Sequence, residues 1–69
     1  MKLSARNQIP ARVVSVNTGE AIANVVLDAG GVRLVASITV EAVRDLGIAE
    51  GGEVTAVIKA SDVLLGVAE

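Results

Sequence analysis

Two short segments near the ends of the chain concentrate hydrogen-bond donors. Residues 4–8 read Ser-Ala-Arg-Asn-Gln, and residues 59–61 read Lys-Ala-Ser. Thr39 adds a hydroxyl, and it precedes a predicted helix whose first backbone N–H groups can bind an anion. If these segments converged, they would form a donor-rich, carboxylate-free pocket, which suits a small oxyanion and not a metal cation. The residues alone favour the plainer interpretation of a polar N-terminal edge, a strand end and a helix cap.

No arrangement of side chains indicates catalysis. The chain has no histidine and no cysteine that could act as a base or a nucleophile. Its acidic residues form no spaced pair typical of acid–base chemistry or chelation, and nothing near Lys59 favours a Schiff base. The glycine pairs at 30–31 and 51–52 fit turns better than phosphate-binding loops. The sequence therefore predicts no catalytic residue, no bare metal-ion site and no organic cofactor.

The composition favours a small protein that associates with itself. The chain has 69 residues, of which 52% are hydrophobic, and it contains no aromatic residue and no cysteine. A core of this size supplies roughly 3–5 kcal/mol, and disulfides cannot add to it here. Continuous apolar runs such as Val25–Leu27 and Val63–Leu65 imply strands that are buried on both faces. We therefore expect a substantial interface between subunits.

Charge and hydropathy disfavour two classes of partner. The net charge is −2, whereas nucleic acid usually selects a basic surface. The absence of aromatic residues removes the side chains on which single-strand binding folds stack bases, so a nucleic-acid module is a distant alternative. No apolar run approaches the roughly 20 residues of a membrane span, and no signal-peptide core follows Met1. We expect no nucleic-acid or membrane partner and a cytoplasmic location.

The elements that must position the donors are short strands and one helix. Alternating and β-branched runs predict strands over residues 12–17, 22–28, 32–38, 53–59 and 63–67. Residues 3–9, which end before Pro10, are a candidate for an additional N-terminal strand. Gly30-Gly31 predicts a tight hairpin connection. Thr39 as N-cap and Gly47 after the last turn predict a helix between them. A helix inserted among the strands of a small β domain predicts an OB-like five-stranded barrel, as one domain over residues 1–69.

The motifs resemble those of a known family. Residues 4–8, and residues 56–63 with the sequence AVIKASDV, are similar to the two signatures of the molbindins. These are small molybdate-binding proteins, also called molybdenum-pterin-binding proteins, built on a transport-associated OB domain. Residues 13–15, 38–39 and 46–51 match the intervening pattern in order and spacing. The similarity covers essentially the whole chain, which resembles the stand-alone form of the domain.

The resemblance implies a fold, an assembly and a ligand. It implies an OB-like barrel in a homohexamer built as a trimer of dimers, with the N-terminal strand a candidate for exchange between subunits. It implies that molybdate, or tungstate, binds between subunits without reaction, for storage and homeostasis in the cell. Carried over by position, the molybdate-binding residues are Ser4, Ala5, Arg6, Asn7, Lys59, Ala60 and Ser61 on one chain, with Thr39 and Ala42 from a neighbouring chain.

The chain departs from the family pattern at three places. Ala42 stands where the family often has serine, which removes one hydroxyl donor. Gly19, Glu20, Ala21 and Ile22 mark a candidate second oxyanion site, where the family usually reads Gly-Ala-Val-Asn. The added charge of Glu20 and the loss of the asparagine at Ile22 weaken the case for that site. Pro10-Ala11 replaces the more usual Lys-Gly and removes a backbone donor.

A second function class stays open at this point. The same barrel could serve as an oligomerisation or partner-docking module whose anion pocket is vestigial. Selectivity among molybdate, tungstate and sulfate depends on the size of the pocket, which a sequence does not specify.

Overall fold

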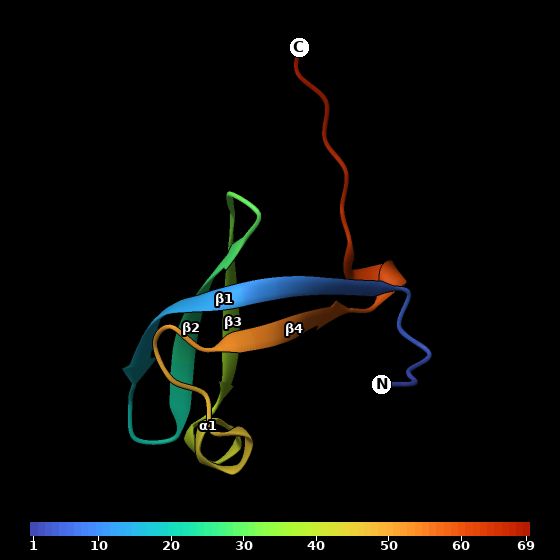
Figure 1. The fold of residues 1–69 in the computed structure, drawn as a ribbon. Coiled ribbons are helices and arrows are strands. Elements are labelled where there is room, and N and C mark those ends of the chain that lie inside the picture. The colour runs from blue at the N-terminus through green and yellow to red at the C-terminus, as the bar shows by residue number, and fades with distance from the viewer.

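Four strands and one short helix form most of the chain. The computed structural model describes residues 1–69. Figure 1 shows the elements in their order along the chain. They are β1 (Asn7–Thr18), β2 (Ile22–Ala29), β3 (Val32–Thr39), the helix α1 (Val40–Leu46), β4 (Glu53–Ile58) and a 3-10 turn, η1 (Ala60–Asp62).

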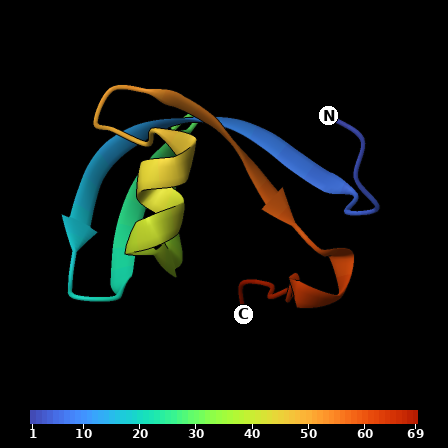
Figure 2. The same cartoon turned by 90° about the horizontal axis from the view of Figure 1, so that it is seen from below.

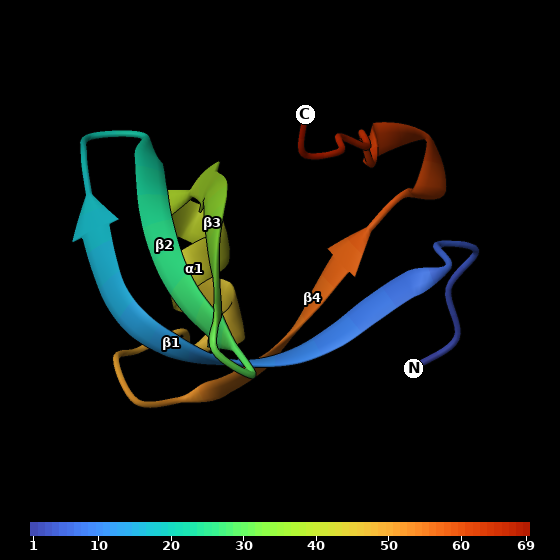
Figure 3. The ribbon, with the colours of Figure 1, turned by 90° about the horizontal axis from the view of Figure 1, so that it is seen from above.

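The strands form one antiparallel sheet in the order β3-β2-β1-β4. The first half of β1 pairs with β4, from Asn7 opposite Ile58 to Arg12 opposite Glu53. Its second half pairs with β2, and the register shifts at Val14, where a β-bulge bends the strand. Figure 3 shows the result, a strongly curved β1 that joins two arms. One arm carries β2, β3 and α1, and the other consists of β4 and the first half of β1.

The hairpin between β2 and β3 confirms the predicted tight turn. Ala29 pairs with Val32, so Gly30 and Gly31 alone form the connection. Both glycines have positive φ, at 61° and 93°, which suits a two-residue turn between twisted strands. The Gly31 N–H donates to Oδ1 of Asp28 at 2.8 Å, which holds the turn closed.

The helix begins and ends where the sequence predicts. The Thr39 side chain accepts a hydrogen bond from the Ala42 N–H, and Glu41 lies in the first turn, where the helix dipole favours an anion. Gly47 ends the helix in the left-handed conformation, with φ of 64°. Val43 is buried and packs against the core of the sheet. No helix of the chain is long and apolar enough to cross a membrane.

Two predictions for the ends of the chain are wrong. Pro10 does not end a strand, because β1 continues through it and Pro10 pairs with Thr55. The missing N–H is tolerated because β1 has a neighbour on only one side at that point. Residues 63–67 form no strand, because no element of the chain lies beside them, and they run away from the sheet in Figure 1. The mainly β fold with one helix is confirmed, with four strands and free edges on β3 and β4 in place of five strands.

The core is small for the surface around it. Six of the 69 residues are buried, namely Ala11, Val13, Ala23, Val25, Leu27 and Val43. The accessible surface is 5439 Å², whereas a compact protein of this mass exposes about 4,000 Å². The radius of gyration is 13.0 Å, against about 11 Å for a compact chain of this length. A single chain therefore exposes roughly 1,400 Å² more than a compact domain of its mass would.

An apolar groove lies between the two arms of the sheet. Its volume is about 250 Å³, and nine of the ten residues that line it are hydrophobic. It is lined by Val25 and Leu27 of β2, Ala36 and Ile38 of β3, Leu46 and Ile48 at the end of α1, and residues 54–57 of β4. Val25 and Leu27 belong to the core, and Ala36, Ile38, Ile48, Val54 and Ala56 pack against it, so the groove is an unfilled extension of the core.

We expect Val13→Ala to destabilise the protein far more than Val14→Ala. Val13 is 1% exposed, whereas its neighbour Val14 is 41% exposed. Removing two buried methyl groups and leaving a cavity costs about 2 kcal/mol of the free energy of unfolding, whereas an exposed valine costs below about 0.5 kcal/mol. Urea unfolding at matched protein concentration measures the difference. Equal losses in both variants would contradict this description of the core.

Candidate functional site

The pairing of β1 with β4 brings the two donor segments together. Asn7 lies opposite Ile58, so residues 4–6 and residues 59–61 leave the same end of the ladder. The Asn7 side chain closes this end, because its Nδ2 donates to the Ile58 carbonyl at 3.1 Å. We call residues 4–7 and 59–61 the donor tip. Figure 2 shows that both segments lie at the end of the molecule remote from α1.

The charges of the donor tip have no partner within the chain. Ser4, Arg6 and Lys59 are exposed, and Asn7 is half-buried. Neither Arg6 nor Lys59 makes an ion pair, since the one ion pair of the structure joins other residues. The two cations are therefore free to bind an anion, and hydrogen bonds from charged donors are roughly twice as strong as neutral ones.

Thr39 and Ala42 lie at the opposite end of the bent sheet. Thr39 ends β3, where it pairs with Ile22, and it is followed directly by α1. Its Oγ1 accepts the Ala42 N–H at 3.0 Å, which leaves the hydroxyl proton of Thr39 available for donation. One chain therefore does not unite these residues with the donor tip (Figure 2). Of the predicted convergence of three segments, a single chain achieves two.

The candidate second oxyanion site, residues 19–22, lies beside Thr39. Gly19 and Ile22 form a tight turn, in which the Gly19 N–H donates to the Ile22 carbonyl at 2.8 Å, and the Ala21 carbonyl accepts the Val40 N–H at 2.8 Å. This turn and the start of α1 enclose a hollow of about 350 Å³. Its lining residues are Glu20, Ala21, Thr39, Val40, Glu41 and Arg44.

The charges of this hollow do not favour an anion in the single chain. Glu20 and Glu41 contribute two carboxylates, and Arg44 contributes one guanidinium. Arg44 was not among the predicted site residues. Its spacing from Glu41 was the available signal, because residues three apart on a helix are neighbours.

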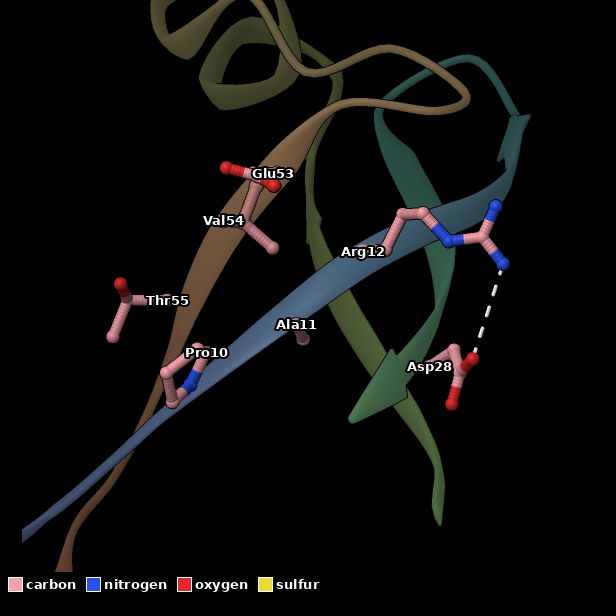
Figure 4. Close-up of a pocket in the computed structure, with 7 residues that line it drawn as sticks. All are labelled: Pro10, Ala11, Arg12, Asp28, Glu53, Val54 and Thr55. Carbon is pink, nitrogen blue, oxygen red and sulfur yellow. Dashed lines mark ion pairs between the residues drawn. The ribbon is translucent and has the colours of Figure 1, made fainter. Parts of the chain in front are cut away.

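A second polar hollow crosses three strands at the middle of β1. Figure 4 shows Arg12 pointing toward Asp28, with Glu53 on the other neighbouring strand. The Arg12–Asp28 ion pair is 3.8 Å long, and the hollow has a volume of about 540 Å³. Both side chains of the pair are largely exposed, so the pair adds little stability. Two carboxylates around one guanidinium do not suit an oxyanion, which leaves the donor tip as the candidate anion site.

Comparison with known proteins gives one consistent family. Residues 3–65 match the model of the TOBE domain. The chain is 47% identical over 66 residues to molybdenum-pterin-binding protein 3 of Clostridium pasteurianum, which covers 94% of this chain and 97% of that protein. It is also similar to the structure of a molybdate-binding protein from Sporomusa ovata, with a TM-score of 0.93, 39% identity, and coverage of 97% of this chain and 100% of the other.

A third similar protein is larger. The structure of the cytoplasmic molybdate-binding protein ModG, with molybdate bound, superposes with a TM-score of 0.93 at 43% identity. The match covers 99% of this chain and 49% of the ModG chain. The similarity therefore extends from complete chains of the same length to part of a longer one.

We expect Thr39→Val to weaken the start of α1 and Thr39→Ser to preserve it. Serine keeps the oxygen that accepts the Ala42 N–H, and valine has the same shape as threonine without it. Loss of an N-cap costs about 1 kcal/mol of the free energy of unfolding. Urea unfolding of both variants checks the difference. A Thr39→Val protein as stable as the Thr39→Ser protein would show that the cap does not stabilise the helix.

Proposed function

We propose, from the premise that the chain belongs to the TOBE-domain family of molybdenum-pterin-binding proteins, that it binds molybdate or tungstate. Binding proceeds without chemical reaction and serves storage and homeostasis of the oxyanion in the cytoplasm. Similarity to the cytoplasmic protein ModG supports the location, and the binding function named for the Clostridium relative supports a non-catalytic role.

The donor tip is the observation that carries the proposal. Molybdate is a tetrahedral dianion with four acceptor oxygens. Arg6 and Lys59 supply two unpaired positive charges from adjacent ends of β1 and β4, and the hydroxyls of Ser4 and Ser61 supply directed donors beside them. Asn7 positions the two segments through its bond to Ile58. Ala5 and Ala60 contribute backbone and no bulk.

A neighbouring chain completes the site in this proposal. The arm that carries the donor tip has only two strands, and a two-stranded ribbon is at best marginally stable by itself. The large exposed surface of one chain supports the same conclusion. We therefore propose a homohexamer, arranged as a trimer of dimers. In it, Thr39 donates its hydroxyl proton to the oxyanion held by another chain's donor tip, with the first turn around Ala42 beside it.

The candidate second site at residues 19–22 is the weaker of the two. Glu20 and Glu41 face the same hollow as Thr39, and their charges repel a dianion. Ile22 is 51% exposed and offers no polar atom of its side chain where the family has asparagine. Any oxyanion held there depends on Arg44 and on backbone N–H groups.

Titration calorimetry tests the proposal at the donor tip. We expect heat on adding molybdate to the native oligomer, and affinity at least about tenfold lower in Arg6→Ala and in Lys59→Ala, since each loses a charge-assisted hydrogen bond. Arg33→Ala is the matched control, because it removes an exposed cation from the β2–β3 hairpin at no cost to the donor tip. Unchanged affinity in both donor-tip variants would overturn the site, and no heat from the intact oligomer would overturn the function.

Native mass spectrometry separates oxyanion binding from a pure docking role. We expect the oligomer to gain discrete masses of molybdate, and sulfate to compete according to the size of the site. The alternative is an oligomerisation or docking module with a vestigial pocket, which predicts the same oligomer with no added mass. An oligomer that stays bare at excess molybdate would favour that alternative.

A further inference from the structure

Three consecutive backbone carbonyls at the donor tip are occupied from within the chain. The Ile58 carbonyl accepts a hydrogen bond from Nδ2 of Asn7 at 3.1 Å. In η1, the carbonyls of residues 59 and 60 accept the N–H groups of Asp62 and Val63, at 2.9 Å and 3.3 Å. Each of these bonds uses a lone pair of the carbonyl oxygen. The acceptors of this segment are therefore directed at the chain itself and not at a ligand.

The other two segments of the proposed site have the same property. The Ala5 carbonyl accepts a hydrogen bond from Nε2 of Gln8 at 3.4 Å, in the short loop that contains Arg6. The hydroxyl oxygen of Thr39 accepts the Ala42 N–H at 3.0 Å, which leaves the hydroxyl proton for donation. In both segments, a donor of the same chain occupies the acceptor.

The groups that stay free at the donor tip are mainly donors. Arg6 and Lys59 make no ion pair, so no carboxylate of the chain lies against either cation. This holds even for Asp62, which directly follows Ser61. The hydroxyls of Ser4 and Ser61 are the side chains beside the cations that can accept as well as donate. The tip therefore presents positive charge and hydrogen-bond donors, with few lone pairs among them.

Tetrahedral oxyanions differ in whether they carry a proton. Molybdate and sulfate are dianions at neutral pH and only accept hydrogen bonds, whereas inorganic phosphate keeps at least one O–H group. That O–H group needs an acceptor, and a site covered by a second subunit lacks the water that would otherwise serve. A donor left unpaired in a covered site lowers the affinity of the ligand that carries it, even when its shape fits.

We propose that the donor tip selects oxyanions that carry no proton and rejects phosphate, and that Asn7 and Gln8 determine this specificity. Their side-chain amides occupy the Ile58 and Ala5 carbonyls, which would otherwise accept the phosphate proton. Neither amide needs to touch the ligand. This inference rests on the proposed function, and it adds selection by protonation to selection by size.

Competition against bound molybdate, followed by calorimetry, tests the selection on the native oligomer. Sulfate and phosphate are the two competitors, because they are similar in size. In mildly alkaline buffer both are dianions, so the proton is the main difference between them. We expect phosphate to bind at least about tenfold more weakly than sulfate. Equal affinities for the two anions would overturn the proposal.

Gln8→Ala and Asn7→Ala test the cause of the selection. Each variant frees one carbonyl and keeps both cations, so the ratio of sulfate affinity to phosphate affinity should fall at least about threefold. A merely structural role would weaken both anions alike and leave the ratio unchanged. Asn17→Ala is the matched control, because it removes an exposed amide from the other end of β1. An unchanged ratio in both test variants would overturn the role of the amides.

The selection and the oxyanion function can be rejected separately. Molybdate binding together with equal affinities for sulfate and phosphate would retain the oxyanion function and reject the selection. An intact oligomer that binds none of the three anions would reject the oxyanion function, and the selection with it.

Discussion

Backbone pairing along β1 determines where every other element lies. Its first half pairs with β4 and its second half with β2, and Arg12 pairs with both Asp28 and Glu53 where the two halves meet. The loop after α1 is also fastened here, because the N–H of Val13 donates to one carbonyl of that loop and its carbonyl accepts an N–H from it, both at 2.8 Å. The bend at the bulge therefore places the donor tip on one arm and α1 on the other. A straight β1 would leave no groove between the arms, and it would hold Thr39 still farther from the donor tip, because the two lie beside opposite ends of this strand.

The features that the sequence predicted are those determined by neighbours in the chain. The cap at Thr39, the left-handed Gly47 and the Gly30-Gly31 turn each depend on local conformation, and each was confirmed. The errors concern Pro10 and residues 63–67, whose state depends on whether a strand lies beside them. No local pattern carries that information. The proximity of residues 4–7 to residues 59–61 is likewise a property of the register, and the family signatures anticipated it without giving its cause.

The exposure of the donor tip links the ligand to the assembly. The charges of Arg6 and Lys59 cost little free energy while water surrounds them. Two unpaired cations that are covered by another subunit lose their hydration, which raises the free energy of the assembly. A dianion between them removes that penalty. A ligand bound only by the assembled state stabilises that state in proportion to the logarithm of its concentration. In the proposed assembly, the oxyanion is therefore a structural component of the interface as well as the cargo.

The free edges of β3 and β4 have a kinetic consequence. Until they are covered, these strands present unpaired N–H and C=O groups to any other chain, and such edges promote mispairing. If a second chain covers these edges, the final folding step is second order in protein concentration. Dilution then prolongs the vulnerable state, and rapid synthesis shortens it. A chain without cysteines avoids at least one way of trapping mispaired copies, since no disulfide can make a wrong pairing permanent.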